Sequence, residues 1–266
     1  MGILNVTPDS FSDGGKWASV EQAIAHGEAL ISAGAEIVDI GGESTRPGAT
    51  ALSAAEEWQR IGPVVSALAA KAVISVDTYH SETARLAATA GAKIINDVTG
   101  GKGDPQMWKT VAGLDVDYIL QHSRGNSVVM NDLASYPQGV VKEVTAELAL
   151  ARDNALQAGI EEQRIILDPG LGFAKVGDQD WEILGGLAEV ANLGHRVLIG
   201  HSRKRSMARV AGPDSKPEER DTASAVVAAW LAKQNFPAAR YTKIWAARVH
   251  NVAASAQAIR TLELLG

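Results

Sequence analysis

The chain has 266 residues, of which 46% are hydrophobic, and a formal net charge of −6 at pH 7. This size allows one large globular domain, and the negative charge argues against a nucleic-acid-binding surface. The chain has no cysteine, which excludes disulfides and thiolate metal sites and fits a reducing compartment. No apolar run approaches the ~18–20 residues of a membrane span, and no signal-peptide pattern is present. We therefore expect a cytoplasmic protein that binds neither membranes nor nucleic acid.

Short β-rich apolar runs alternate along the chain with segments of helical periodicity. Such alternation predicts parallel strands joined by right-handed crossovers. Repeated eight times, it predicts an α/β fold of the closed (β/α)8 or TIM-barrel type, with residues 1–266 as a single domain. The runs are Ile3–Val6, Glu36–Ile40, Val73–Val76, Lys93–Ile95, Asp117–Leu120, Arg164–Leu167, Arg196–Ile199 and Ile244–Val249.

The intervening segments carry helix signals. Ser19 is the expected N-cap of the first helix, which Gly34 is expected to end. Ser53 precedes the second helix with Glu56 three residues later, the pattern of a capping box. Apolar residues at helical spacing predict a long helix over residues 138–159.

Every predicted strand ends on, or runs directly into, polar residues. In a barrel these carboxyl-terminal ends meet at one mouth, where active sites are built. A polar residue at one strand end is unremarkable, but its recurrence at all the strand ends indicates a functional mouth. The residues concerned include Asn5, Asp39, Asp77, Asn96, Asp97, Gln121, His122, Asp168, Lys204, Arg248 and His250.

Basic residues gather near the end of the chain, where barrels often bind phosphate. Lys204, Arg248 and His250 follow the last two predicted strands, and Arg46 lies in an earlier loop. The helical pattern after residue 250 would present free amides to an anion. Each residue alone could form a surface ion pair, but their clustering favours an anion site.

A second group of polar residues suits a small heterocycle. Asp77, Asn96 and Asp168 end three strands, and carboxylates are good acceptors for a guanidine-like group with several N–H donors. The alternative is that they hold neighbouring loops in place. We prefer that alternative for Asp97, which alternation directs away from Asn96.

The first loop has the composition of a hard-cation site. Asn5, Asp9 and Asp13 offer oxygen ligands, which Mg²⁺ prefers and often shares with substrate phosphates. Their spacing permits magnesium without selecting it. The loops around Gly14 and residues 45–48 are long enough to serve as lids.

Other polar and aromatic residues are expected to have ordinary roles. His26 and His195 are predicted to face solvent, and Ser202 lacks the partners of a hydrolytic triad. Four tryptophans at helical positions are expected to pack helices onto the barrel rather than to stack on a ligand. They are Trp58, Trp108, Trp181 and Trp230.

Taken together, the motifs resemble the dihydropteroate synthase family over essentially the whole chain. They are GILNVTPDSFSDGG (2–15), VDIGGESTRPGA (38–49), SVDTY (75–79), INDVTGG (95–101), LDPGLGFAK (167–175), SRK (202–204) and RVH (248–250). The resemblance implies condensation of 6-hydroxymethyl-7,8-dihydropterin diphosphate with 4-aminobenzoate to give 7,8-dihydropteroate and diphosphate, in folate biosynthesis. It also implies a cytoplasmic homodimer inhibited by sulfonamides.

The resemblance further implies a role for individual residues. Asn5 would bind Mg²⁺ together with the substrate diphosphate, and Asp13, Lys204 and Arg248 would be catalytic. The diphosphate would be bound by Asn5, Arg46, Arg248 and His250. The pterin would be bound by Asp77, Asn96, Asp168 and Lys204. The 4-aminobenzoate would be bound by Phe11, Thr45 and Pro47.

The chain departs from the family pattern at four places near these motifs: Gln121, His201, Ser206 and Asn251. We expect Asn251 to adjust the surroundings of His250 and Ser206 to loosen the aminobenzoate side. Two alternatives stay open at this point. One is a pterin-binding paralogue with weak or no synthase activity, and the other is a pterin-dependent methyltransferase barrel.

Overall fold

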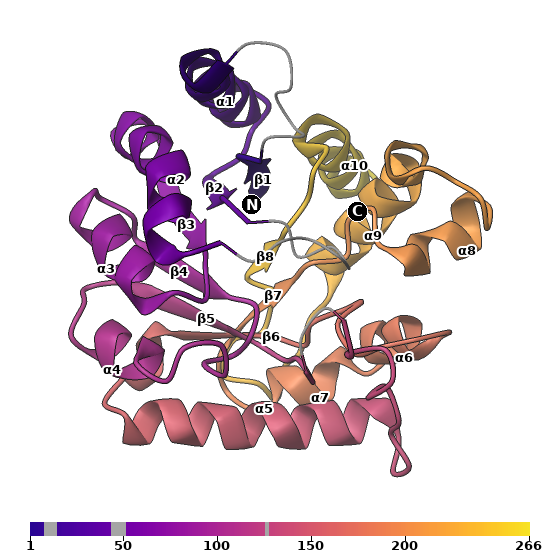
Figure 1. Ribbon diagram of the computed structural model, residues 1–266. Helices are drawn as coiled ribbons and strands as arrows, with labels where there is room; N and C mark the ends of the chain where they lie inside the picture. The colour runs from indigo at the N-terminus through magenta and orange to yellow at the C-terminus, as the bar shows by residue number, and fades with distance from the viewer. Residues whose placement is uncertain (8–14, 44–51, 126–127) are drawn as a thin grey trace.

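The computed structural model describes residues 1–266 apart from 8–14, 44–51 and 126–127 (Figure 1). Its eight strands form one parallel sheet in chain order, from β1 to β8. Ile3 N donates to Val249 O at 3.0 Å, which brings the segment after β8 back to β1 and closes the barrel. The predicted (β/α)8 barrel is therefore confirmed. The strands are β1 Gly2–Asn5, β2 Ile37–Gly41, β3 Val73–Asp77, β4 Ile94–Asp97, β5 Asp117–Gln121, β6 Ile165–Asp168, β7 Arg196–Ile199 and β8 Ala246–Ala247.

Helices surround the strands on the outside, and the long α5 runs across the lower edge of the view in Figure 1. They are α1 Gly15–Ser32, α2 Ala54–Leu68, α3 Ser81–Thr89, α4 Met107–Ala112, α5 Val140–Gln157, α6 Gln179–Gly185, α7 Leu187–Ala191, α8 Ala208–Ala211, α9 Asp221–Lys233 and α10 Val252–Leu264. None of them, within the described part of the chain, combines the length and apolar character needed to cross a bilayer.

Most, but not all, of the predicted capping residues lie at the observed ends of helices. Ser53 Oγ accepts from Glu56 N at 3.3 Å, and Glu56 Oε2 accepts from Ser53 N at 2.9 Å, so the capping box is confirmed. Gly34, in the left-handed region at φ +105°, ends α1 as predicted. Ser19 is not an N-cap, because α1 begins at Gly15 and passes through it. The preceding Lys16-Trp17-Ala18 contains no helix breaker, so nothing forces a start at Ser19.

Two predictions about surface residues have opposite outcomes. His26 on α1 is exposed, as expected. His195 is only 3% exposed, so the prediction that it faces solvent is wrong. Burial lowers the pKa of the His195 imidazole below its ordinary value. A turn position alone did not reveal that the side chain folds inward before β7.

The barrel interior begins with an apolar layer near the amino-terminal ends of the strands. Because side chains alternate along a strand, inward-facing positions recur every second residue. The residues two positions further along therefore face the same interior, closer to the mouth. The apolar layer consists of Ile94, Ile119, Ile166 and Leu198, packed with Met1, Ile37, Trp245 and Ala246.

Candidate functional site

Directly above the apolar layer, the interior becomes polar. On each of these strands, the residue two positions after the apolar one is polar or a glycine, and it lies on the same face of the sheet. This change of chemistry at one level of the barrel defines the candidate site. The residues are Asp39, Asn96, Gln121, Asp168, Gly200 and Arg248.

Arg248 joins strands from opposite ends of the sequence into one cluster. Its Nε donates to Asp39 Oδ2 at 2.6 Å, and its Nη2 donates to Asp77 Oδ2 at 2.8 Å. Asn96 Nδ2 donates to the same Asp39 oxygen at 3.0 Å. The sequence placed Asp39 among the polar strand residues but gave it no role, although its position two residues after Ile37 already directed it inward.

Several acceptors in this cluster are left for a ligand. Asp39 Oδ1, Asn96 Oδ1 and Ser75 Oγ are buried and have no hydrogen-bond partner among the described residues. A buried polar atom without a partner costs ~1–3 kcal/mol. A bound molecule with several N–H donors would recover that cost.

Burial dominates the electrostatics of the cluster. It raises the pKa of Asp77 to about 7, although the adjacent Arg248 guanidinium acts in the opposite direction. For Arg248, the carboxylates of Asp39 and Asp77 outweigh burial, and its pKa lies above the ordinary value. The guanidinium is therefore a fixed cation, while Asp77 exchanges its proton near neutral pH.

A second cluster lies at and just beyond the ends of the neighbouring strands β6 and β7. A Cβ at Gly200 would lie 3.6 Å from Asp168 Oδ2 and 3.7 Å from Lys204 Nζ. The missing side chain of Gly200 thus leaves room between an acid and a base. Burial raises the pKa of Asp168 and lowers that of Lys204, and each charge partly offsets the effect on the other.

The loops behind this pair fix its geometry. Asp168 Oδ1 accepts from Gly170 N at 2.7 Å, and Lys204 donates to the carbonyl of Leu171. Gly172, at φ +74°, has no side chain, and a Cβ there would lie 3.1 Å from Lys204 Cδ. The segment after β6 therefore encloses the Lys204 side chain.

His250 lies beside Ser202, at the start of the chain's last helical region. Its backbone N and its Nδ1 both lie 3.2 Å from Ser202 Oγ. Burial and the charges of Arg203 and Arg248 lower the pKa of His250 to about 3. The imidazole is neutral at pH 7 in this state, so it acts as a hydrogen-bonding group rather than as a cation.

Asn251 has a structural role that the sequence did not predict. Its Oδ1 accepts from Ala254 N at 3.0 Å and caps α10, and its Nδ2 donates to Asp221 Oδ2 at 3.0 Å. Asp221 also binds Arg203 through Nε at 2.7 Å and Nη2 at 2.9 Å. Arg203 has a left-handed backbone at φ +60°, so Asp221 holds a strained residue immediately before Lys204.

The other departures from the family pattern are buried and mostly hydrogen-bonded. Gln121 Nε2 donates to Val98 O at 3.3 Å, and His201 Nε2 donates to Ser224 O at 2.8 Å. The Ser206 carbonyl accepts from Trp181 Nε1 at 3.2 Å. These contacts support the loops around the site.

Asp97 has the structural role that was expected of it. Its carboxylate accepts from Thr99 N at 2.8 Å, from Gly101 N at 2.8 Å and from the Tyr118 hydroxyl at 2.8 Å. It thereby fixes the turn after β4, on the opposite side of the strand from Asn96.

The mouth also includes residues whose surroundings are only partly described. Asn5 ends β1 and is exposed at the mouth. No group of three or more His, Asp or Glu side chains within the described ranges could by itself hold a metal ion. The predicted site residues in the first two loops lie outside the described residues: Asp9, Phe11, Asp13, Thr45, Arg46 and Pro47.

Known proteins are similar to this chain over nearly its whole length. A family model described as pterin binding enzyme matches residues 1–243. A dihydropteroate synthase of Mycobacterium leprae (strain TN) is 42% identical over 98% of this chain and 91% of its own length. The Xanthomonas albilineans dihydropteroate synthase solved with 4-aminobenzoic acid is 40% identical, with a TM-score of 0.86 over 100% of this chain and 92% of that one. The Anaplasma phagocytophilum enzyme with bound 6-hydroxymethylpterin-monophosphate is 35% identical, with a TM-score of 0.86 over 100% and 98% of the chains.

Proposed function

This chain belongs to the dihydropteroate synthase family of pterin binding enzymes, and from that premise we propose how its barrel mouth performs the reaction. The enzyme is a transferase of folate biosynthesis. It joins 6-hydroxymethyl-7,8-dihydropterin diphosphate to 4-aminobenzoate and releases diphosphate.

The pterin is held between the two polar clusters, in contact with Asp77, Asn96, Asp168 and Lys204. Two observations support this proposal: the buried acceptors of the first cluster that have no partner among the described residues, and the room that Gly200 leaves between Asp168 and Lys204 in the second. The aminopyrimidinone edge of a pterin offers N–H donors to these acceptors and a carbonyl to the Lys204 ammonium.

The diphosphate is held at the rim by Arg248, His250 and Asn5, with Arg46 from the second loop. Arg248 is a permanent cation, and its charge-assisted bonds to phosphate oxygens are of the strong class. The Asn5 amide oxygen suits a Mg²⁺ ion that is mainly bound by the diphosphate itself. When bound, that ion neutralises charge on the leaving group.

The reaction is a substitution at the methylene carbon of the pterin. The aminobenzoate nitrogen forms a bond to this carbon, the carbon–oxygen bond to diphosphate breaks, and the amine releases one proton to solvent or to the departing diphosphate. Positive charge that develops on the methylene spreads into the pterin, near the carboxylates of Asp77 and Asp168. Charges arranged in advance around a developing cation and a departing anion stabilise the transition state more than the substrates.

The aminobenzoate lies on the loop side of the pterin, with Phe11, Thr45 and Pro47 around it and Asp13 near the reacting carbon. Alignment of the amine with the carbon contributes part of the ~7–11 kcal/mol available from positioning. Sulfonamides resemble the aminobenzoate in shape and charge, so we propose that they compete for this place. We also propose a cytoplasmic location, which the lack of cysteine supports.

The functional unit is a homodimer formed through α8 and α9. Val210, Val226 and Trp230 are exposed by 68%, 63% and 39% on these helices, beside a groove lined mainly by apolar residues. Exposed apolar side chains that adjoin one another are typical of interfaces. Trp230 therefore differs from Trp58, Trp108 and Trp181, which pack against the core as predicted.

Lys204→Met tests the assignment of the pterin site. With both substrates and Mg²⁺, we expect the purified wild type to form dihydropteroate. The variant should lose about 100-fold or more in kcat/KM, as for the loss of one preorganised charged donor. Retention of near-normal activity by the variant would rule out the proposed role of Lys204.

Chelation tests the metal. We expect EDTA to suppress turnover and added Mg²⁺ to restore it, and Asn5→Ala to raise the Mg²⁺ concentration that gives half-maximal rate. An enzyme indifferent to EDTA would remove the metal from the mechanism and Asn5 from its role.

A further inference from the structure

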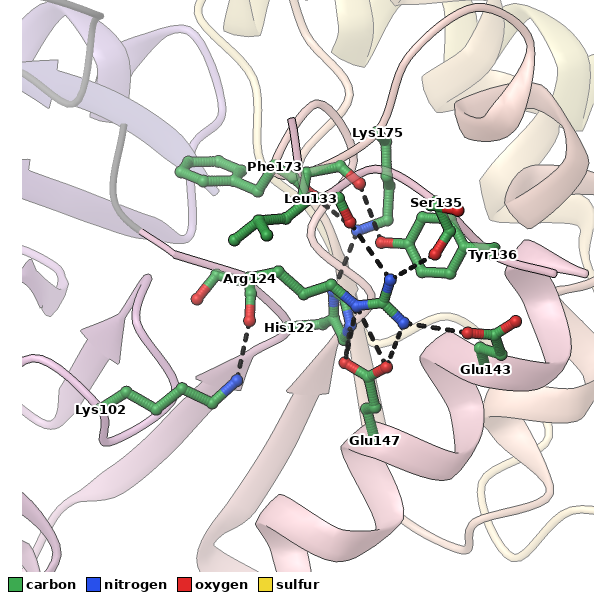
Figure 2. A network of polar contacts seen from close by, with 12 residues as sticks. Lys102, His122, Arg124, Leu133, Ser135, Tyr136, Glu143, Glu147, Phe173 and Lys175 are labelled. Carbon is green, nitrogen blue, oxygen red and sulfur yellow. Dashed lines mark hydrogen bonds and ion pairs between the residues drawn. The ribbon is translucent and has the colours of Figure 1, made fainter. Parts of the chain in front are cut away.

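A buried lysine that the reaction does not use lies behind the site. Lys175 is 6% exposed, and its Nζ lies 3.0 Å from His122 Nδ1 and 2.9 Å from the Phe173 carbonyl (Figure 2). A buried ammonium is costly unless its donors are used. Burial disfavours the charged form and lowers the pKa of Lys175 to about 7. A lysine kept at such a position is expected to have a structural role.

Lys175 is the inner end of a polar network that reaches an outer helix. His122 Nε2 lies 3.0 Å from Glu147 on α5, and Arg124 Nε lies 3.1 Å from both oxygens of the same carboxylate. The Arg124 guanidinium lies 4.0 Å from the centre of the Tyr136 ring. Figure 2 shows these side chains converging between the ends of β5 and β6 and α5.

Hydrogen bonds from the network fix one strained turn, at residues 173–175. Ala174 has a left-handed backbone at φ +50°, a conformation that is strained for a residue other than glycine. The two carbonyls on either side of its Cα are both fixed: Lys175 donates to Phe173 O, and the Tyr136 hydroxyl donates to Ala174 O at 2.8 Å. Because both carbonyls accept side-chain hydrogen bonds, the turn is kept in this strained conformation.

That turn faces Lys204. The Phe173 ring lies 4.9 Å from Lys204 Nζ, and the Leu171 carbonyl accepts from the same ammonium. Lys204 can align with a pterin only if these neighbours hold its four-carbon stem in one conformation. A chain of contacts therefore runs from α5 through His122 and Lys175 to the pterin-binding lysine.

We propose that Lys175 is a positioning residue, which holds the 171–175 turn against His122 and thereby fixes the Phe173 ring and the Leu171 carbonyl around Lys204. The proposal rests on the function proposed above for Lys204. It assigns Lys175 no contact with either substrate.

Lys175→Met tests this, because it keeps the length of the side chain and removes the ammonium. We expect kcat/KM to fall roughly 10- to 100-fold, the loss typical when a catalytic group is displaced by about 1 Å. We also expect the Kd for a pterin, measured on the folded fraction of the variant, to rise. Lys142→Met, on the exposed face of α5, is the matched control and should behave as wild type. A Lys175→Met enzyme whose kcat/KM stays within about twofold of the wild-type value would overturn the proposal, because Lys204 would then not have been displaced.

A double-mutant cycle separates positioning from general support of the fold. If Lys175 acts through Phe173, adding Lys175→Met to Phe173→Ala should cause little further loss of kcat/KM. Fully additive losses would contradict the proposal, because the two residues would then act independently.

Tyr136→Phe is a milder variant in case Lys175→Met folds poorly. It removes only the hydroxyl that binds Ala174 O and should lower kcat/KM roughly two- to tenfold. Tyr241→Phe, before β8, is the control, and equal behaviour of the two would count against a role for the turn. Lys204→Met measured in parallel keeps the two proposals apart: if it is active, the function proposed for Lys204 fails, whereas if only the turn variants are active, the present inference fails alone.

Discussion

Arg248 balances the charge of two carboxylates at the mouth, and we propose that it also binds the leaving diphosphate. It lies between the carboxylates of Asp39 and Asp77, and the side chain of Asp39 is fully buried. Removing one partner of a buried ion pair leaves an unpaired charge, which costs more than the pair itself contributes.

Arg248→Met should therefore lower the free energy of unfolding by about 3–5 kcal/mol at pH 7, in addition to its effect on turnover. The loss should shrink as the pH falls through about 7, because burial raises the pKa of Asp77 to about 7 and a protonated Asp77 needs no cation. Denaturant unfolding at several pH values measures this. Arg240→Met, whose ion pair with Glu162 is more than half exposed, is the control and should change stability by less than about 1 kcal/mol. Equal losses in the two variants would contradict the buried-pair account.

Asp77 predicts a pH dependence of pterin binding. Its pKa is raised to about 7 by burial, so the carboxylate form prevails above neutrality and the protonated form below it. Only the carboxylate accepts two N–H bonds, and we therefore expect pterin affinity to fall as the pH falls through about 7. Calorimetry measures the pterin affinity over a range of about 1.5 pH units on either side of 7, from about pH 5.5 to about pH 8.5. Asp77→Asn should bind weakly with a flat profile, and an unchanged slope in that variant would assign the titration to another group.

At the residue scale, alternation along a strand was the informative signal. It correctly separated Asn96, which faces the barrel interior, from Asp97, which fixes a turn. It could not reveal that Lys175 contacts His122, because nothing in either motif shows which buried residues meet across two loops. The role of Asp39 was missed for a similar reason, since its partner Arg248 lies 209 residues away.

The loop after β6 lies close against the residue that follows β5. Gly170 has φ +66°, and a Cβ there would lie 2.0 Å from the His122 carbonyl oxygen. Gly177 has a similar φ of +58° but no atom within 4 Å of its Cβ position. The two glycines therefore share the conformational requirement and differ only in crowding.

Gly170→Ala should destabilise the protein by several kcal/mol more than Gly177→Ala, which should cost only the ~1–2 kcal/mol of a left-handed alanine. Thermal and denaturant unfolding of the two variants provide the comparison. If both lose the same stability, the β5 and β6 loops are not in the close contact described here.

Gly200 on the loop after β7 allows a test without backbone strain. An added Cβ would meet the polar heads of Asp168 and Lys204 at ordinary contact distances, in the space assigned to the pterin. Gly200→Ala should keep its stability and lose pterin affinity by tenfold or more, a loss of about 1.4 kcal/mol in binding. Unaltered affinity, measured by calorimetry, would place the pterin elsewhere.

At the element scale, the strands were predictable because apolar runs and turn residues bounded them clearly. The last strand was expected over Ile244–Val249 and is only Ala246–Ala247, although the backbone beyond it still pairs with β7 and β1. The start of α1 was misplaced because a capping residue inside a helix-forming stretch looks the same in sequence as a true cap.

On the scale of the whole molecule, the apolar surface of α9 predicts self-association. Val226→Glu should convert a dimer into a monomer, because it places a charge in the proposed interface. Leu150→Glu on α5 is the matched control, since both side chains are 63% exposed. Sedimentation of the two variants and the wild type decides the matter. A wild type that sediments as a monomer would contradict the homodimer.

The barrel explains how residues so distant in sequence become neighbours. An apolar layer fills the amino-terminal half of the interior, and the next inward position of each strand supplies the site. Sequence periodicity predicted this arrangement in outline. The pairing of charges within it depended on long-range contacts, which periodicity does not encode.

The central claim is that the two polar clusters hold one pterin between them, with its diphosphate at the rim. A crystal structure of the protein with 6-hydroxymethylpterin monophosphate tests this most directly. We predict the ring between Asp77, Asn96, Asp168 and Lys204, and the phosphate beside Asn5, Arg248 and His250. A pterin bound outside this space, with Arg248 still paired to Asp39 and Asp77 and far from the phosphate, would contradict the account.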